Sequence, residues 1–334
     1  MRDTTLVSVV TPFYNTAAYL AECIESVLAQ THGHFEYVLL DNASTDGSGE
    51  IAARYAARDA RIRLARNETL LTQTQNYNRA LELVHPGARY VKIVQADDWL
   101  FPRCLAEMVA LADEHPSVAI VSSLDKRGRT VHGEGLLPEQ RVLRGREVCR
   151  LVLLEDRFFF GSPTTVMYRA DVVRARRPFF PEVAHFADTL AAFEILRDHD
   201  FGFVHQVLSY TRIREDSISG AAVTFDPEPL DKLIRVVRCG RLHLDPHEYE
   251  KRRRAVEQGY YRHLAAAWLK RREPAYWDWH RKGLATVGEV IDRRQLARAV
   301  AIEVLAGVMP SGLRVALRSR SRMSATAAPM EDPR

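Results

Sequence analysis

The chain has 334 residues and a mass of 38.0 kDa, with 46% hydrophobic and 27% charged residues. This composition is that of an ordinary globular protein, and it excludes a disordered chain, a collagen-like fibre and a multispanning membrane protein. The net charge of +4 is unevenly distributed, because residues 1–230 carry −6 and residues 231–334 carry +10. A mildly acidic body and a basic C-terminal region are therefore expected to meet different partners.

In residues 1–125, short β-rich runs alternate with segments of helical periodicity. The expected strands are residues 6–11, 37–40, 62–65, 90–94 and 118–121. The expected helices between them are residues 18–30, 49–58, 74–84 and 102–114. This alternation predicts an α/β fold with a mostly parallel sheet and helices on both faces.

After residue 125 the alternation ends. A Gly- and Arg-rich loop at 126–135 precedes an expected helix at 146–154, a strand at 164–168, a helix at 189–197 and a strand pair within 201–211. Beyond residue 226 the chain is expected to be helical and Arg-rich, with a disordered tail. Its four cysteines form no CxxC pair, and neither a signal peptide nor an apolar run of about 20 residues is present. We therefore expect a cytoplasmic chain with reduced thiols.

Polar clusters follow three of the expected strands, at residues 11–15, 41–48 and 95–99. Ligands of open α/β sheets bind outside the carboxyl ends of the strands, so these clusters are expected to line one crevice. The alternative is turn and helix-capping chemistry, which explains Ser44, Asp46 and Ser48 equally well. In the third cluster, the adjacent carboxylates of Asp97 and Asp98 repel each other unless a cation lies beside them. We expect Mg²⁺ or Mn²⁺ there, although Asp98 could instead cap the following helix.

The segments SVVTPFYN, LLDNASTDGS, NYNRAL and VQADDWLFP resemble, in order and spacing, the signature segments of family 2 glycosyltransferases of the GT-A fold. The resemblance covers about residues 5–220 and implies an inverting glycosyltransferase that uses a nucleotide-sugar donor. The residues that it places at the donor are Thr11, Pro12 and Tyr14 against the base and ribose, Asp41 and Asn42 at the base, Asn78, Asp97 near the ribose, and Asp98 as the principal metal ligand of a DxD-like motif.

The resemblance also implies a catalytic base and a phosphate contact. Asp188 matches the aspartate of the family's Glu-Asp segment, with Ala187 in place of the glutamate, and would accept the proton of the acceptor hydroxyl; a helix N-cap is the alternative. Arg214 stands where the family commonly has histidine, which favours a clamp on the diphosphate over a metal contact; a solvated arginine is the alternative. The aromatic turn at 158–163 is expected either in the acceptor wall or in the core.

We expect three segments: a catalytic domain at 1–225, divided into a nucleotide-sugar-binding half (1–125) and an acceptor half (126–225), a helical basic region at 226–322, and a disordered tail at 323–334. The expected donor is a UDP-, dTDP- or GDP-sugar, and the acceptor a saccharide or lipid-linked hydroxyl in cell-surface polysaccharide, glycolipid or glycan synthesis. The basic amphipathic segments 293–308 and 313–322 form either a lid or a contact with an anionic membrane surface. No nucleic-acid-binding module is recognised, and the oligomeric state stays open.

Two other functions are compatible with this sequence. A catalytically silent nucleotide-sugar-binding protein would explain the departures at Ala187 and Arg214, although Asp98 and Asp188 argue against it. A sugar nucleotidyltransferase shares the broad fold but needs a Gly-rich basic loop after the first strand, where this chain has Phe13-Tyr14-Asn15.

Overall fold

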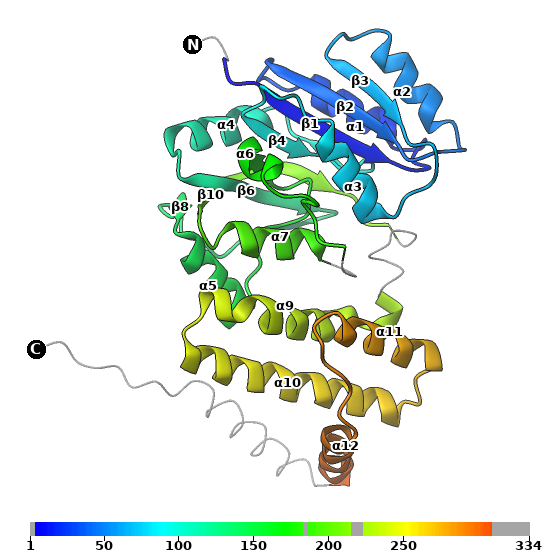
Figure 1. The fold of residues 1–334 in the computed structure, drawn as a ribbon, viewed down its shortest axis with the longest axis vertical. Coiled ribbons are helices and arrows are strands. Elements are labelled where there is room, and N and C mark those ends of the chain that lie inside the picture. Colours follow the sequence, from blue (N-terminus) through cyan, green and yellow to red (C-terminus); the bar gives the residue numbers. More distant parts are fainter. Residues whose placement is uncertain (1–3, 183–185, 215–222, 309–334) are drawn as a thin grey trace, which may run out of the picture. The chain divides into compact units, whose positions relative to one another are not determined.

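The computed structural model describes residues 4–182, 186–214 and 223–308. The chain divides into two compact units (Figure 1), of which the first contains the residues up to 223 together with 235–252. The second contains residues 224–234 and those from 253 onward. The C-terminal region expected to begin at residue 226 is therefore shared between the units, which are described separately below.

Within the described residues, ten strands of the first unit form one sheet with the path β3-β2-β1-β4-β9-β6-β10-β5, to which β7 is added at β6 and β8 at β10. The strands are β1 (Val7–Phe13), β2 (Phe35–Asp41), β3 (Ile62–Arg66), β4 (Tyr90–Ile93), β5 (Trp99–Leu100), β6 (Val118–Arg127), β7 (Thr130–His132), β8 (Val142–Leu143), β9 (Met167–Arg169) and β10 (Asp200–Thr211).

The two halves of this sheet differ in strand direction. β1 runs parallel to β2 and β4, and β2 runs parallel to β3, as the alternation of the first 125 residues predicts. β9 then enters antiparallel between β4 and β6, and β10 pairs parallel with β6. The predicted α/β class is confirmed, and the second half adds antiparallel pairs that make the sheet mixed.

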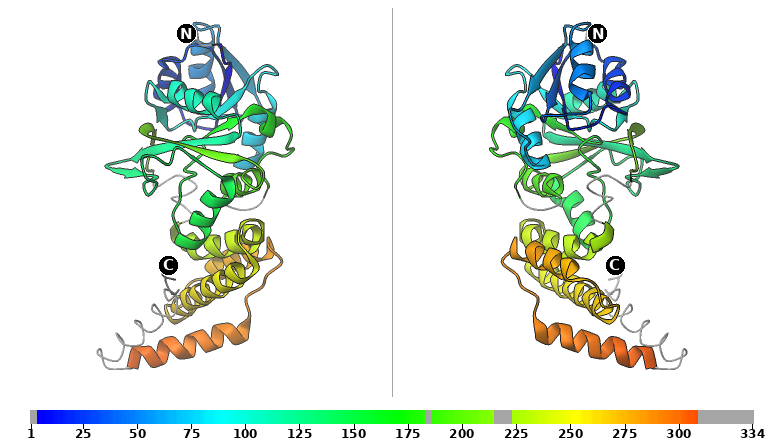
Figure 2. Two further views of the ribbon diagram at one scale, coloured as in Figure 1. Left: turned by 90° about the vertical axis from the view of Figure 1, so that its left-hand side faces the viewer. Right: turned by 90° about the vertical axis from the view of Figure 1, so that its right-hand side faces the viewer.

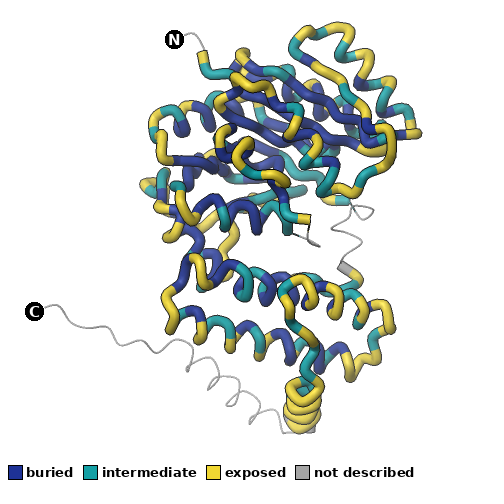
Figure 3. The backbone as a smooth tube through the Cα atoms, in the orientation of Figure 1, coloured by how far each residue is buried: buried dark blue, intermediate teal, exposed yellow. Residues whose placement is uncertain are grey.

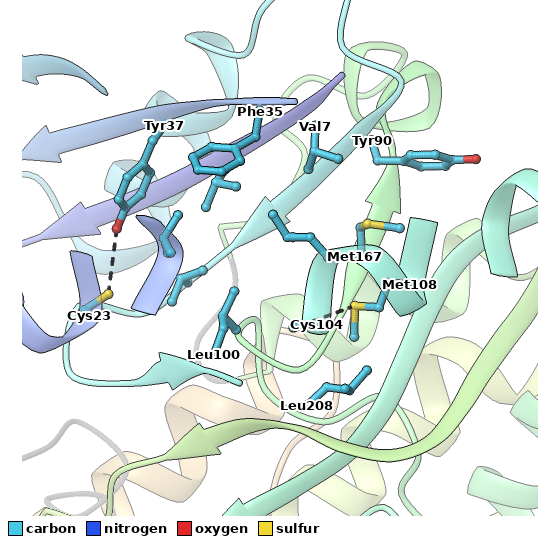
Figure 4. Packing of buried hydrophobic residues seen from close by; sticks show 14 of the residues in the cluster. Val7, Cys23, Phe35, Tyr37, Tyr90, Leu100, Cys104, Met108, Met167 and Leu208 are labelled. Atoms are coloured by element: carbon cyan, nitrogen blue, oxygen red, sulfur yellow. Dashed lines mark hydrogen bonds between the residues drawn. The ribbon is translucent and has the colours of Figure 1, made fainter. Parts of the chain in front are cut away.

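Helices cover both faces of the sheet in the first unit (Figure 2). They are α1 (Leu20–Leu28), α2 (Ser48–Ala56), α3 (Gln73–Glu82), α4 (Cys104–Glu114), α5 (Gly145–Glu155), α6 (Ala170–Arg174) and α7 (Ala187–Ile195). The apolar side of α1, with Cys23 and Val27, packs with α4 on one face of the sheet. Figure 4 shows this core, in which Tyr37 points toward Cys23, and Cys104 and Met108 lie beside Leu208. Figure 3 shows that the central strands are buried along almost their whole length.

Two predictions for residues 126–211 are wrong, and three short elements were not predicted. The expected loop at 126–135 contains β7, which pairs with the end of β6 across a turn where Gly128 has φ of +57°. The expected strand pair at 201–211 is one strand, β10, whose register with β6 shifts at three places. The short elements β5, β8 and α6 were not predicted, because two to five residues show no periodicity and form only against their partner strands.

Four further helices, α9 (Pro227–His243), α10 (Pro246–Leu269), α11 (Pro274–Ala285) and α12 (Arg293–Val308), agree with the helical character predicted for the C-terminal region. Three of them begin with proline, whose missing N–H costs nothing in the first turn of a helix. In the second unit the buried imidazole of His280 bonds to the Tyr260 hydroxyl (3.0 Å) and to the Phe225 carbonyl (3.1 Å). Burial lowers the pKa of His280 to about 4, so its imidazole is neutral.

The helix α12 has the bounds that the sequence predicts, but its apolar residues are not gathered on a buried face. Ile302, Val304 and Leu305 are 55%, 46% and 62% exposed, and Figure 3 shows most of α12 as exposed. The second amphipathic segment (313–322) and the tail (323–334) lie outside the described residues. Among the helices that are described, none combines the length and the apolar character needed to cross a membrane.

Candidate functional site

The loops after β1 and β2 are joined by hydrogen bonds. The hydroxyl of Ser44 accepts from the Asn15 N–H (3.1 Å), and the hydroxyl of Ser48 accepts from the Thr16 N–H (2.8 Å). The Asp46 carboxylate accepts from the Ala17 N–H at 2.9 Å. These side chains therefore connect the loop after β1 to the start of α2, where the Asp46 carboxylate also accepts from the Ser48 N–H (3.0 Å), as the capping alternative predicts.

The residues predicted to contact the base after β1 differ in exposure. The Thr11 side chain is fully buried, and its hydroxyl lies 2.9 Å from the Tyr37 hydroxyl inside the core. Pro12 is buried as well, whereas Tyr14 is 43% exposed. Of these three side chains, that of Tyr14 alone is exposed, whereas Thr11 and Pro12 belong to the buried part of β1.

Asp41 is the last residue of β2, Asn42 follows it, and both are buried. Asp41 accepts from the Ser44 N–H (2.8 Å), and its second oxygen lies 3.1 Å from the guanidinium of Arg66. The Asn42 amide bonds to both backbone groups of Leu71 and accepts from the amide of Asn67 (2.9 Å). The Asp41 carboxylate lies beside the loop that follows β2, and the Asn42 amide holds the segment that precedes α3 in place.

Asn78 lies on α3, and its amide bonds to the backbone of Phe180. It donates to the carbonyl of Phe180 (2.9 Å) and accepts from the N–H of the same residue (2.8 Å). The structure therefore does not place the Asn78 side chain with the other predicted donor residues. The asparagine of α3 that does join them is Asn76, which accepts from Asn67, the same amide that donates to Asn42.

The structure places Asp97 and Asp98 in the turn between β4 and β5. Asp98 is almost fully buried and accepts from the hydroxyl of Thr164 (2.6 Å) and from the N–H of Arg212 (2.9 Å). Burial raises the pKa of Asp98 to about 7, against the lowering effect of these two hydrogen bonds. The Asp97 carboxylate is more exposed and lies 3.3 Å from the guanidinium of Arg214.

Two residues that sequence reasoning missed position this turn. Thr164 donates to Asp98 and accepts from the Gln95 N–H (3.0 Å), so one hydroxyl fixes both ends of the turn. The ammonium of Lys92, fully buried in β4, donates to the carbonyls of Thr164 (2.5 Å) and Val166 (3.1 Å). A lysine inside the apolar run YVKIV was the available signal, because buried lysines are rare unless they are paired.

The end of β10 closes against the same turn. The Arg212 guanidinium donates to the Asp97 carbonyl (3.0 Å), pairs with Glu22 (2.5 Å) and lies 4.8 Å from the centre of the Tyr19 ring. The Arg214 guanidinium lies 4.7 Å from the centre of the same ring. Two arginines and an aromatic ring therefore border the acidic turn, of which the sequence predicted Arg214 alone.

Asp188 lies in the first turn of α7 and lines a cleft of about 690 Å³. Phe186 precedes the helix as a left-handed residue without a side-chain cap bond, and Asp188 accepts instead from the N–H of Thr189 (2.7 Å). Burial raises the pKa of Asp188. The structure does not show the capping alternative, because Asp188 follows the cap position and its hydrogen bonds are to the N–H and the hydroxyl of Thr189 (3.5 Å).

The cleft and the acidic turn share a neighbourhood around Tyr77. Tyr77 and Gln95 line the cleft together with Asp188, Phe158 and other residues of the turn at 158–163. Burial raises the pKa of Tyr77, the Gln95 side chain lowers it through a hydrogen bond, and the charges of Asp97, Asp98 and Asp188 raise it further. Gln95 therefore links the cleft to the acidic turn, because its N–H and the Asp98 carboxylate bond to the same Thr164 hydroxyl.

The donor set at the acidic turn fits a hard divalent cation that is completed by substrate oxygens. Among the described residues, no cluster of three or more His, Cys, Asp or Glu could hold a metal without other ligands. The Asp98 carboxylate is buried and has two neutral donors in the described part of the chain, which leaves oxygen lone pairs for a cation. Mg²⁺ is commonly held by one or two carboxylates together with substrate phosphates, which is the ligand set that this turn offers.

A mixed α/β sheet with an acidic turn and a cleft at its carboxyl edge is the architecture of GT-A glycosyltransferases. Residues 8–177 match the model of glycosyl transferase family 2, and the chain belongs to this family. It is 37% identical to the putative glycosyltransferase EpsE of Bacillus subtilis, over 73% of this chain and 85% of the relative. It is 39% identical to the putative teichuronic acid biosynthesis glycosyltransferase TuaG of the same organism, over 28% of this chain and 36% of the relative.

Two solved structures share the fold at low sequence identity. S. aureus TarS 1-349 in complex with UDP-GlcNAc has a TM-score of 0.63 at 18% identity and covers 87% of this chain and 83% of its own. The mannosyltransferase PcManGT from Pyrobaculum calidifontis, in complex with GDP-Man and Mn²⁺, has a TM-score of 0.54 at 18% identity and covers 97% of this chain and 86% of its own. These two structures confirm the predicted GT-A fold, and the family model and the similarity to EpsE confirm the predicted family.

Proposed function

We propose that this chain is an inverting, metal-dependent glycosyltransferase that moves a sugar from a nucleotide-diphosphate donor to a hydroxyl acceptor in bacterial cell-surface polysaccharide synthesis. The observation that carries the proposal is that Asp188 and Gln95 line one cleft, and that the Thr164 hydroxyl bonds Gln95 to Asp98 in the adjoining acidic turn. The role of TuaG in teichuronic acid biosynthesis supports the polysaccharide assignment, and the ligands bound in TarS and PcManGT support a nucleotide-sugar donor.

In this proposal Asp188 is the general base. Its carboxylate takes the proton of the acceptor hydroxyl while the hydroxyl oxygen bonds to the anomeric carbon and the bond from that carbon to the diphosphate breaks. A pKa raised by burial makes Asp188 a stronger base than an exposed aspartate, and its place in the cleft gives a substrate access to it. The nucleoside diphosphate leaves with the bonding electrons.

Asp97 and Asp98 hold the donor end of the site. A divalent cation bound at Asp98 would supply neutralisation of the leaving diphosphate's charge. Tyr14 and Asp41 lie on the loops where the base and ribose are expected, and Arg214 beside Asp97 supplies a guanidinium for phosphate oxygens. We expect the base of the donor to be uracil, thymine or guanine. The shape of the pocket that these loops form selects among the three.

We further propose that the chain works at the cytoplasmic face of the membrane, where a lipid-linked acceptor would be reached. The support is the +10 charge of residues 231–334 together with the exposed arginines and apolar residues of α12.

The experiment is incubation of the purified chain with a panel of UDP-, dTDP- and GDP-sugars in Mn²⁺, with nucleoside diphosphate release as the readout. Release that is stimulated by oligosaccharide or lipid-linked acceptors is the expected result. Binding of a nucleotide sugar without release would indicate a silent binding protein, and formation of pyrophosphate or nucleoside triphosphate would indicate a nucleotidyltransferase. Either of the last two results would overturn the proposal.

A further inference from the structure

Arg127 is a basic residue of the cleft that the reaction described above does not use. It is the last residue of β6, its side chain is 32% exposed, and it lines the cleft that Asp188 also lines. Among the described residues that line this cleft, Arg127 alone has a lysine or arginine side chain, while Asp188 and Glu182 are acidic. A cation at this place can decide which charges the cleft accepts.

The guanidinium of Arg127 is held in place from one side. Its Nε donates to Asp125 (2.8 Å), a buried carboxylate that also accepts from the hydroxyls of Ser209 (3.0 Å) and Thr211 (2.9 Å) on β10. The two Nη groups have no hydrogen-bond partner within the part of the chain that the structure describes. An arginine anchored through Nε keeps its two terminal nitrogens in a fixed fork, which matches two oxygens of a phosphate or carboxylate.

We propose that Arg127 binds an anionic group, a phosphate or a carboxylate, of a substrate that occupies the cleft. This inference deepens the proposed function, because it assigns charge recognition to the same cleft. The group belongs either to the diphosphate of the donor or to an acidic acceptor, such as a phosphorylated or uronic saccharide. In both cases Arg127 offsets the repulsion that Asp188 and Glu182 exert on an anion.

The first test needs no transfer reaction. The melting temperature of the full chain is measured in sodium phosphate and in sodium chloride at equal ionic strength, for the wild type, Arg127→Gln and Arg129→Gln. Arg129 is exposed, lies two residues away and does not line the cleft, so it is the matched control for lost charge. An anion at about ten times its Kd is expected to raise the melting temperature of the wild type and of Arg129→Gln by about 2 °C or more, and Arg127→Gln should lose this rise.

The proposal is overturned if phosphate raises the melting temperature of Arg127→Gln as much as that of the wild type, or if it stabilises neither. Since Arg127→Gln leaves the buried Asp125 without its cation, the double variant Asp125→Asn/Arg127→Gln is compared in the same way, which keeps the test valid if the single variant does not fold. Arg127→Lys keeps the charge without the fork, and it should retain only part of the rise in phosphate.

The second test identifies the source of the anion once a donor has been found. A raised donor KM in Arg127→Gln, with the acceptor KM unchanged, assigns the diphosphate, and the reverse assigns an acidic acceptor. We expect about a tenfold or larger rise in one of the two KM values, as loss of a charge-assisted hydrogen bond gives. Unchanged values of both would overturn substrate recognition by Arg127. A wild type that transfers no sugar would count against the proposed function and leave the melting comparison intact.

Discussion

Arg214 and Asp97 form an ion pair, with 3.3 Å between Nη1 of the guanidinium and Oδ2 of the carboxylate, and both side chains are less than one quarter exposed. Both residues were expected at the donor, and the pair places a guanidinium directly beside the acidic turn that contains Asp98. An arginine cannot replace a histidine as a metal ligand, but it can bind phosphate oxygens with two nitrogens at once. The pair therefore lies where the ribose and the phosphates of the donor are expected to meet.

Arg214→Ala should raise the donor KM about tenfold with a smaller effect on kcat, because it removes a charge-assisted contact to the donor phosphates. Steady-state kinetics with varied donor concentration measure this change. Arg214→Lys keeps the charge but not the two-nitrogen fork, and its donor KM should lie between those of the wild type and Arg214→Ala. A donor KM in Arg214→Ala equal to that of the wild type would show that Arg214 only balances the charge of Asp97.

Asp98→Asn should abolish nearly all transfer and weaken Mn²⁺ binding, because the amide still accepts from Arg212 but carries no charge for the cation. Since burial raises the pKa of Asp98 to about 7, the carboxyl is protonated below that pH, and the proton then competes with the metal ion for the carboxylate. The apparent Mn²⁺ affinity of the wild type should therefore fall about tenfold for each pH unit below 7. Calorimetric titration of Mn²⁺ in the presence of donor checks both statements, and full activity of the wild type in excess chelator would contradict the assignment.

Asp188→Asn should lower turnover by about 10²-fold or more while donor binding is retained, because an amide has the shape of the carboxylate but cannot accept a proton. Burial raises the pKa of Asp188, and the base works only when it is ionised. When the pH is lowered, kcat should therefore begin to fall at a pH above the ordinary pKa of aspartate. A pH–rate profile of kcat measures this limb, and equal turnover of the variant and the wild type would mean that the base lies elsewhere.

Asn78→Ala should destabilise the chain by about 1–3 kcal/mol, because both backbone groups of Phe180 lose their side-chain partner. Urea unfolding measures the loss, and Arg79→Ala, on the exposed side of the same helix, is the control. A direct role in donor binding, as the sequence suggested, predicts instead a raised donor KM at unchanged stability. That second pattern would contradict the structural role.

The full chain should sediment with anionic vesicles and stay in the supernatant with neutral ones, because each basic residue near an anionic surface adds about 1 kcal/mol of attraction. Salt should release it, since the attraction is screened. A chain that ends at Asp292 lacks α12 and the basic residues beyond it, and should remain in the supernatant with both kinds of vesicle. If the full chain also stays in the supernatant at low salt, the C-terminal segments form a lid or an oligomer contact and the membrane proposal fails.

The sequence by itself determined the helices and strands whose apolar residues recur with a regular local spacing. The runs that became β1, β2 and β4 are rich in valine, leucine and isoleucine because both faces of the sheet are covered, and that pattern is visible without any partner. The bounds of α12 and the carboxylate pair Asp97-Asp98 are likewise visible in short stretches of sequence. Position after a strand was sufficient to place Asp41, Asp97 and Asp98 at the carboxyl edge, because parallel strands end at the same side of a sheet.

The tertiary structure alone decided the contacts between residues far apart in the chain. Asn78 meets Phe180 across 102 positions, and Asp98 meets Arg212 across 114, so no local period records either pair. The antiparallel direction of β9 and the single long strand β10 also depend on which partner edge each strand meets. Lys92 is polar and yet buried, because two carbonyls that precede β9 receive its hydrogen bonds, and burial lowers the pKa of its amine. A side chain's role follows from its partners, and the fold chooses these by bringing distant backbone groups within hydrogen-bonding distance.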